Sequence, residues 1–583
     1  MIRLPCRRLA VVVLAAVTMA GCVSIPTDSS ISRGRDVGVR DEPQLNSNLP
    51  PGPASGASRE DIVAGFFDAM LAYPRQDALA REFLTQRAAE EWTPDQSLVV
   101  YDDQEVTDGP DRVTVQALRL GTLDSRGAWT SSTPATSKVN VSLRTELVDG
   151  QWRIENPPVG TYIDADYFDR YLEPFSLYFF DPTETILTPD PIYLPLGEST
   201  LALLVEDLLR GPSLRLAGIV STAAPRGLTV AGAVTLSTTG RAQIPLSSQA
   251  REMSGNQRRL LAAQLTWTLK PLTEVESIVL TVDGKRIEVP GSGAAFGIDA
   301  FSGYDPAGFG ASLRQLFGLS SRGLVTVSVD GTSPVTGSIG RGHNDARSGA
   351  VEPSGDRAAL VDAVGHRLVV GEVSTVGTGT SVWFRNGTDL LRPSWDIHHV
   401  LWVVDATAQG AAVYTLTAGR SRRVEVAGIS GETVLGFAVS RDGARLAAIV
   451  RERDKTKLLI SIIDRSSERP ADVDLSAAEE VEGPDVTFSG TDNVTWLSPT
   501  SVAVLANDDG GDLQPFEVRI DGSNLSTFDG FLPIRPVTIA AAPNPDVPLV
   551  VGSSNARLYL RSPEAGWAAY SQQAKVRQPF YPG

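Results

Sequence analysis

The chain has 583 residues, a length that predicts about four domains. Its hydrophobic content of 42% and charged content of 21% are typical of globular proteins and exclude a mostly disordered chain. Lysine and arginine total 52 against 69 aspartate and glutamate residues, which gives a net charge of −17. An acidic surface repels phosphate backbones, so nucleic acid is not an expected partner.

The first 21 residues have the pattern of a bacterial signal peptide. Three arginines precede an apolar run of twelve residues, 9–20, which is too short to span a membrane as a helix. The run ends in Met19-Ala20-Gly21 before Cys22, which is typical of a lipobox, with Met where Leu is usual. We therefore predict a signal peptide over 1–21 and lipidation of the Cys22 thiol. An ordinary secretory signal with a chance cysteine is the alternative.

Residues 22–57 are predicted to form a lipidated, flexible tether. They contain five prolines among serine, asparagine and glycine, a composition that buries little surface. Two or more acyl chains anchor a protein stably, so we predict localisation at the extracytoplasmic face of the cell membrane. The only other cysteine, Cys6, lies in the signal peptide, so the sequence predicts no disulfide and no cysteine metal site in the folded body.

Residues 58–170 are predicted to form an α+β domain. Ser58 opens a helix whose apolar residues recur at helical spacing, and a second helix extends to Trp92. Alternating apolar residues over 139–154 are interrupted by Asp149-Gly150, a sequence typical of hairpin turns. Helices followed by such strands favour the α+β class.

Residues 171–290 have the predicted order β-α-β-β-α-β-β. An apolar strand over 175–180 is followed by a helix with inward leucines that ends at Gly211-Pro212. A second helix carries leucines on one face, and Asp283-Gly284 turns the last hairpin. This unit resembles the GerMN module, which implies an extracytoplasmic interaction or assembly domain and not an enzyme. The resemblance lies in its Leu177-Tyr-Phe179, Leu208-Leu-Arg-Gly-Pro212, Gln264-Leu-Thr-Trp-Thr-Leu269 and Val282-Asp-Gly284 segments.

The C-terminal residues 331–583 are predicted to form an all-β propeller of five or six blades. Apolar strands recur after Ser, Pro or Asp turns, and Ser354, Ser394, Ser440 and Ser498 are spaced by 40, 46 and 58 residues. A period of about 40–50 residues with short strands is typical of propeller blades. A β-sandwich with accidental spacing is the alternative. Residues 291–330 are predicted to be a connector with one short helix over 313–317.

The order of these parts resembles the LpqB family of actinobacterial lipoproteins. The shared features are the lipobox, the small N-terminal domain, the GerMN module, a propeller with Leu391-Arg-Pro-Ser-Trp-Asp396, and the ending Pro579-Phe-Tyr-Pro-Gly583. The resemblance implies an accessory lipoprotein without known catalytic residues. It also implies binding to the extracytoplasmic domain of an MtrB-like sensor histidine kinase, with an influence on two-component signalling, cell-wall metabolism and division.

Motifs that carry chemistry are weak in this sequence. His398-His399 invites a metal site, but neighbours on one strand point to opposite faces, so a structural role is favoured and no metal is predicted. The loop over 508–512 has three carboxylates, whereas calcium needs six to eight oxygens, so a polar turn is favoured. An acidic run is interpreted either as a solvated loop or as a docking patch for a basic partner. It consists of Glu479, Glu480, Glu482 and Asp485.

Two other functional classes stay open. The propeller could carry a pair of carboxylates for glycoside hydrolysis, since such pairs are defined by distance in space and not by sequence. Its mouth could also bind a cell-wall glycan or peptidoglycan fragment. Tryptophans that could supply a stacking surface, although blade core is the favoured role for most, are Trp383, Trp395, Trp402, Trp496 and Trp567. No cofactor is predicted.

Overall fold

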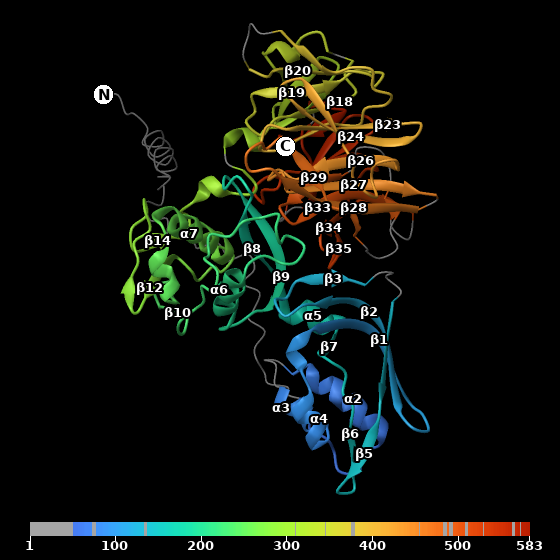
Figure 1. Ribbon diagram of the computed structural model, residues 1–583. Helices are drawn as coiled ribbons and strands as arrows, with labels where there is room; N and C mark the ends of the chain where they lie inside the picture. Colours follow the sequence, from blue (N-terminus) through green and yellow to red (C-terminus); the bar gives the residue numbers. More distant parts are fainter. Residues whose placement is uncertain are drawn as a thin grey trace, which may run out of the picture. The chain divides into compact units, whose positions relative to one another are not determined.

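The structure is a computed structural model in which three folded domains follow one another along the chain (Figure 1). It describes residues 50–583 apart from 73–76, 133–136, 309, 344, 375–378, 454, 482–486, 489–493, 508–510, 529, 563–565 and 572. The signal peptide, Cys22 and most of the tether lie outside the described residues. Among the residues that are described, no helix is both long and apolar enough to cross a membrane.

The N-terminal domain packs helices on an antiparallel-rich sheet, which confirms its α+β class, although the predicted second helix up to Trp92 is divided into two short helices, α3 and α4. Ser58 caps α2 with a capping box, because its hydroxyl accepts the Asp61 N–H and the Asp61 carboxylate accepts the Ser58 N–H. The predicted turn at Asp149-Gly150 joins β5 and β6, with both residues at positive φ. The sheet order is β3-β2-β1-β7, with β4 beside β2. The elements are α2 (Arg59–Met70), α3 (Asp77–Arg81), α4 (Gln86–Glu91), β1 (Leu98–Asp108), β2 (Val113–Leu123), β3 (Trp129–Ser131), β4 (Lys138–Leu143), β5 (Thr145–Val148), β6 (Gln151–Ile154), β7 (Thr161–Asp164) and α5 (Ala165–Tyr171).

The GerMN-like domain has two strands more than its sequence predicts, β9 and the short β14, which pairs with β12. Its first strand pairs with a second, β9, into a long hairpin that stands apart from the sheet β10-β11-β12-β13. The three prolines of β9 argue against a strand at the level of the sequence, but a strand with an open edge tolerates them. The elements are β8 (Leu172–Phe180), β9 (Leu187–Pro195), α6 (Thr200–Arg210), β10 (Thr235–Leu236), β11 (Arg241–Leu246), α7 (Gly255–Leu269), β12 (Ser277–Val282), β13 (Lys285–Arg286) and β14 (Phe296–Gly297).

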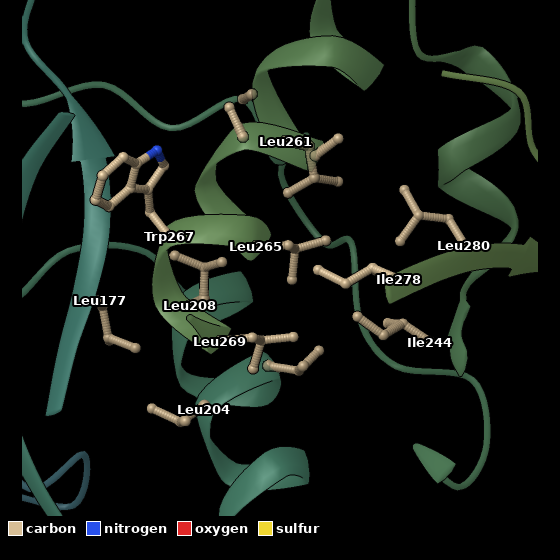
Figure 2. Packing of buried hydrophobic residues seen from close by; sticks show 14 of the residues in the cluster. Leu177, Leu204, Leu208, Ile244, Leu261, Leu265, Trp267, Leu269, Ile278 and Leu280 are labelled. Carbon is tan, nitrogen blue, oxygen red and sulfur yellow. The ribbon is translucent and has the colours of Figure 1, made fainter. Parts of the chain in front are cut away.

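The core of this domain lies on both sides of α7 (Figure 2). Leu177 of β8 lies on one side of the helix, and Ile244 and Ile278 of the sheet lie on the other. Since α7 is buried on most of its surface, its polar side chains need partners. Gln264 donates to the Tyr178 carbonyl (2.8 Å), and the Thr268 hydroxyl accepts the Tyr178 N–H (3.2 Å), so the helix hydrogen-bonds the open edge of β8.

The propeller consists of six sheets within the described residues, which confirms the propeller class. Blade one is closed by the chain end, because β40 pairs with β15 through Phe580 and Phe317. The blades are, in order, β15 (Leu316–Ser320), β16 (Gly323–Ser328), β17 (Gly331–Pro334) with β40 (Gln578–Phe580); β18 (Ser348–Val351), β19 (Arg357–Val361), β20 (Leu368–Glu372), β21 (Ser381–Phe384); β22 (Ser394–Trp395), β23 (Leu401–Thr407), β24 (Gly410–Thr417), β25 (Arg420–Val424); β26 (Thr433–Val439), β27 (Arg445–Glu452), β28 (Lys455–Arg465), β29 (Val473–Leu475), β30 (Glu479–Glu480); β31 (Thr487–Phe488), β32 (Val494–Ser498), β33 (Ser501–Asn507), β34 (Leu513–Arg519), β35 (Leu525–Thr527); and β36 (Pro536–Ala540), β37 (Val550–Ser553), β38 (Leu558–Ser562), β39 (Gly566–Ala569).

The predicted connector over 291–330 is too long at its C-terminal end. Strands β15 and β16 already belong to blade one, and the predicted helix over 313–317 is a short 3-10 turn, Ala311–Arg314, followed by a strand. The error has a physical cause. The inner strand of blade one comes from the far end of the chain, so no turn marks the start of this blade in the sequence.

Candidate functional site

The Ser-Asp turns of the propeller hydrogen-bond within their own blade and to the next blade. In blade four the Ser440 hydroxyl donates to Asp442, which also accepts a backbone N–H two residues further on. In blade three the Asp396 carboxylate accepts from the Trp402 indole (3.0 Å) and from Arg465 (2.7 Å). These carboxylates fix the turns between first and second strands, so the sequence repeat has a structural cause.

Arg441 lies in the turn between β26 and β27 of blade four. It closes the propeller axis at the end where the C-terminal residues Pro582 and Gly583 also lie. The residue is 3% exposed, and it donates to the Ala307 carbonyl (2.7 Å) before blade one and to the Pro582 carbonyl (2.5 Å) at the chain end. Burial lowers the pKa of Arg441 to about 9. The cavity beside it has a volume of ≈ 40 Å³, against roughly 300–1,000 Å³ for small-molecule sites. This end of the axis therefore has no room for a sugar ring.

Polar contacts join the propeller to the hairpin β8–β9. Arg445 at the start of β27 is 3% exposed and donates to the Pro189 carbonyl (2.5 Å). The Tyr193 hydroxyl of β9 hydrogen-bonds the Ser523 hydroxyl of blade five. The guanidinium of Arg445 in blade four and the hydroxyl of Ser523 in blade five therefore both contact β9.

The N-terminal domain contacts both of the other domains near this point. Arg126 donates to the carbonyls of Gly211 (2.8 Å) and Pro212 (2.6 Å), which terminate α6. The Ser131 hydroxyl of β3 donates to the backbone carbonyl of Asp521 in blade five (3.1 Å). Three domains thus meet around one point.

A cavity of ≈ 540 Å³ lies at this meeting point, and we call it the junction cavity. Its volume falls within the range of about 300–1,000 Å³ that ligand sites occupy. Buried Asp190 on its wall accepts the Ser213 N–H (2.6 Å), and burial raises the pKa of Asp190. The residues that define the junction cavity here are Trp129, Asp190, Leu214, Arg445, Ile460 and Asp521.

The two adjacent histidines contact different carboxylates. His398 is largely buried, and its Nε2 lies 3.7 Å from Asp181 of the GerMN-like domain. His399 sits at positive φ, and its Nδ1 lies 2.5 Å from Glu352. Burial disfavours the charged form of Glu352, but hydrogen bonds from Arg357 and His399 outweigh it and lower the pKa of Glu352. The two histidines lie in the turn between β22 and β23 and not on one strand, so the strand argument of the sequence analysis is wrong, but their divergent partners still favour a structural role.

The acidic run is partly engaged within the chain. Glu479 forms an ion pair with Arg215 of the GerMN-like domain (3.0 Å), and Glu480 forms one with Lys457 of the neighbouring strand (2.8 Å). Glu482 and Asp485 lie outside the described residues, as do Asp508, Asp509 and Gly510 of the oxygen-rich loop. Among the described residues, no group of three or more His, Cys, Asp or Glu side chains could hold a metal ion.

The tryptophans serve mainly as blade core. Trp395 and Trp402 are fully buried, and Trp496 is 5% exposed, so these three offer no stacking face to a glycan. Trp383 and Trp567 are half-buried and pack against Trp395 and Phe528, respectively. The aromatic mouth that a glycan site needs is therefore not formed by the residues the sequence offered for it.

Sequence reasoning missed the residues of the junction. Asp190, Arg445 and Asp521 belong to segments that are distant in sequence, so no local motif unites them. One signal was available, because Arg445 directly precedes the apolar run 446–450 of β27, and an arginine buried at the start of such a strand needs a partner.

An α+β domain, a GerMN-like domain and a ring of six blades together define a multidomain protein of the propeller class. Three family models match successive parts of the chain: "Lipoprotein LpqB, N-terminal domain" over 52–169, "Sporulation and spore germination" over 176–288, and "Lipoprotein LpqB beta-propeller domain" over 322–582. The chain belongs to the LpqB lipoprotein family.

Similarity to family members extends over nearly the whole chain. Lipoprotein LpqB of Cutibacterium acnes is 28% identical over 562 residues, which cover 92% of this chain and 93% of the relative. Lipoprotein LpqB of Streptomyces coelicolor is 27% identical over 620 residues, covering 100% and 98%. Among solved structures, TolB from Acinetobacter baumannii matches 46% of this chain and 65% of its own, with 14% identity and a TM-score of 0.33.

Proposed function

We propose that this lipoprotein is anchored through a lipid on Cys22 at the outer face of the cytoplasmic membrane, where it binds the extracytoplasmic domain of an MtrB-like sensor histidine kinase. Binding would modulate two-component signalling linked to cell-wall metabolism and division. Membership of the LpqB family supports the proposal, because its members are described as lipoproteins.

The observation that carries the proposal is the junction of the three domains. Buried Arg445 and the hydroxyl of Tyr193 bond across domain boundaries, so the domains present a joint surface to a partner. An anchored binder raises its effective concentration near a membrane-embedded partner. It biases the signalling equilibrium only through different affinities for the two states of that partner.

Binding is tested by titrating the full chain, purified in detergent, into the isolated extracytoplasmic domain of the kinase in a calorimeter. We expect saturable binding with a fixed stoichiometry. The absence of heat up to about 0.1 mM of the domain would reject this partner.

Anchoring is tested with Cys22→Ala in cells. The variant should leave the membrane fraction and lose most of its effect on signalling, because the tether no longer holds it beside the kinase. Cys6→Ala is the matched control, since Cys6 lies within the predicted signal peptide and should leave retention unchanged. Full signalling by a soluble Cys22→Ala protein would contradict the role of the anchor.

A further inference from the structure

Two residues on the wall of the junction cavity each carry one charged atom without a hydrogen-bond partner. Arg445 Nη1 and Asp521 Oδ2 are both buried, and neither has a hydrogen-bond partner among the described residues. Their residues are 3% and 7% exposed. Leaving such groups unpaired is costly, so these two residues hold charges that the described chain does not fully compensate.

Both residues are held in place by their other atoms. Arg445 donates from Nη2 to the Pro189 carbonyl, and its Nη1 lies 3.9 Å from Asp442, too far for a hydrogen bond. Asp521 uses Oδ1 to accept the Ser523 N–H (3.0 Å) and the Ser523 hydroxyl (2.6 Å). The free atoms therefore have fixed positions, which is the preorganisation that a binding site needs.

The wall of the cavity combines negative charge with apolar surface. Its only basic residues among the described ones are Arg215 and Arg445. Carboxylates outnumber them: Asp124, Asp190, Glu479, Glu480 and Asp521. Aliphatic side chains lie between the charges: Leu214, Leu216, Ile460, Ile462, Val481 and Ile520.

Leu214 marks the rim of this cavity. Leu214 is 94% exposed and lies four residues beyond the end of α6 at Arg210. An exposed large aliphatic side chain beside a cavity favours contact with an apolar partner group. The single aromatic ring on the wall, that of Trp129, is 5% exposed and packs against Phe168 (5.1 Å between ring centres), so it offers little stacking surface to a sugar.

We propose that the junction cavity binds an extended peptide segment of a partner protein in which a lysine or arginine is flanked by aliphatic residues. The basic side chain neutralises the excess of carboxylates, and its aliphatic neighbours contact Leu214 and Ile460. This site does not depend on the identity of the partner, so it stands apart from the proposed kinase interaction.

The test measures fluorescence anisotropy of labelled peptides with the full chain in detergent. The probe is a mixture of peptides with a central arginine and randomised Leu, Ile or Val on both sides. The matched control mixture has citrulline, the neutral isostere, in place of arginine. We expect saturable binding of the arginine mixture that weakens when NaCl rises from about 0.05 to 0.5 M, and weaker binding of the citrulline mixture.

Substitutions then locate the binding. Leu214→Arg places a positive charge at the rim and should weaken the arginine peptides about tenfold or more. Phe531→Arg is the control, because Phe531 is also an exposed apolar side chain, 86% exposed, and makes the same change of net charge away from the cavity. Asp521→Asn should weaken binding with little change in shape. Equal affinity in the wild type, Leu214→Arg and Asp521→Asn would overturn the proposal.

Other results are equally decisive. No saturable binding of the arginine mixture up to about 1 mM, or saturable binding of an N-acetylglucosamine oligomer that Leu214→Arg abolishes, would overturn the proposal. The same variants are titrated with the extracytoplasmic domain of the kinase. If the peptides bind at the cavity but the kinase domain does not bind, the cavity proposal stands and the proposed function fails. If the kinase domain binds and the peptides do not, the proposed function stands and the cavity proposal fails.

Discussion

Two arginines four positions apart on blade four border spaces of very different size. Arg441 and Arg445 are equally buried, at 3% exposure. Arg441 donates to two carbonyls from distant parts of the chain, beside a cavity of only ≈ 40 Å³. Arg445 donates to one carbonyl and faces ≈ 540 Å³. A buried arginine therefore fills the space where carbonyls surround it, and it borders an open cavity where they do not.

The largest effect is expected from Arg441→Met. The substitution leaves the Ala307 and Pro582 carbonyls without their donor, and an unsatisfied buried acceptor costs about 1–3 kcal/mol. We expect a loss of about 2–5 kcal/mol of stability, measured by urea unfolding of the full chain. Arg445→Met, which orphans one carbonyl, should lose less. A larger loss for Arg445→Met would reverse the comparison between the two arginines.

A second, smaller effect concerns pH. His398 lies beside the same turns, facing Asp181, Asp396, Asp442 and Arg465, and burial, followed by the charge of Arg465, lowers the pKa of His398. The folded state then binds the proton less readily than the unfolded state. Stability is therefore complete above the unfolded pKa of about 6.5 and is lost as pH falls through the folded pKa.

This pH effect is measured against His398→Asn, which cannot be protonated. Unfolding of both proteins is followed between pH 7.5 and about 5, and one group changes stability by at most about 1.4 kcal/mol per pH unit. We expect the wild type to lose more stability on acidification than the variant. Parallel curves for the two proteins would show that His398 has the same pKa in the folded and the unfolded state, which would contradict the lowering of its pKa by burial.

The fold could be predicted well from the sequence where patterns are local. Helical spacing, the Asp149-Gly150 turn and the GerMN-like segments all lie within short windows. The helix α7 also explains one of these segments, because Gln264 and Thr268 bond the edge of β8 at Tyr178. The start of the propeller could not be predicted, since blade one is completed by residues from the chain end.

The junction cavity could not be predicted, because it depends on the docking of domains. Asp190 lies on a proline-rich strand that sequence patterns do not identify, and Asp521 follows a strand of blade five. Nothing local brings either residue near Arg445. The acidic run was noticed as a docking patch or a solvated loop, whereas Glu479 and Glu480 line the cavity and pair with basic residues nearby.

The smallest effect tests how the junction is held. Tyr193 and Ser523 share one hydroxyl contact between the GerMN-like domain and blade five. Burial, followed by the charge of Asp521, raises the pKa of Tyr193 to about 12, so the hydroxyl stays neutral in physiological conditions. A neutral hydrogen bond contributes about 0.5–1.5 kcal/mol, so Tyr193→Phe should cost that amount.

A double-mutant cycle with Ser523→Ala isolates this contact from the other bonds of Ser523. If the junction is held by individually weak contacts, the coupling energy should match a single hydrogen bond, and binding of the arginine peptides should persist in Tyr193→Phe. A coupling energy near zero would mean that the domains are held elsewhere. If Tyr193→Phe lost as much stability as Arg441→Met, the contacts at the junction would be as strong as those at the propeller axis. The difference between the surroundings of the two arginines would then not correspond to a difference in stability.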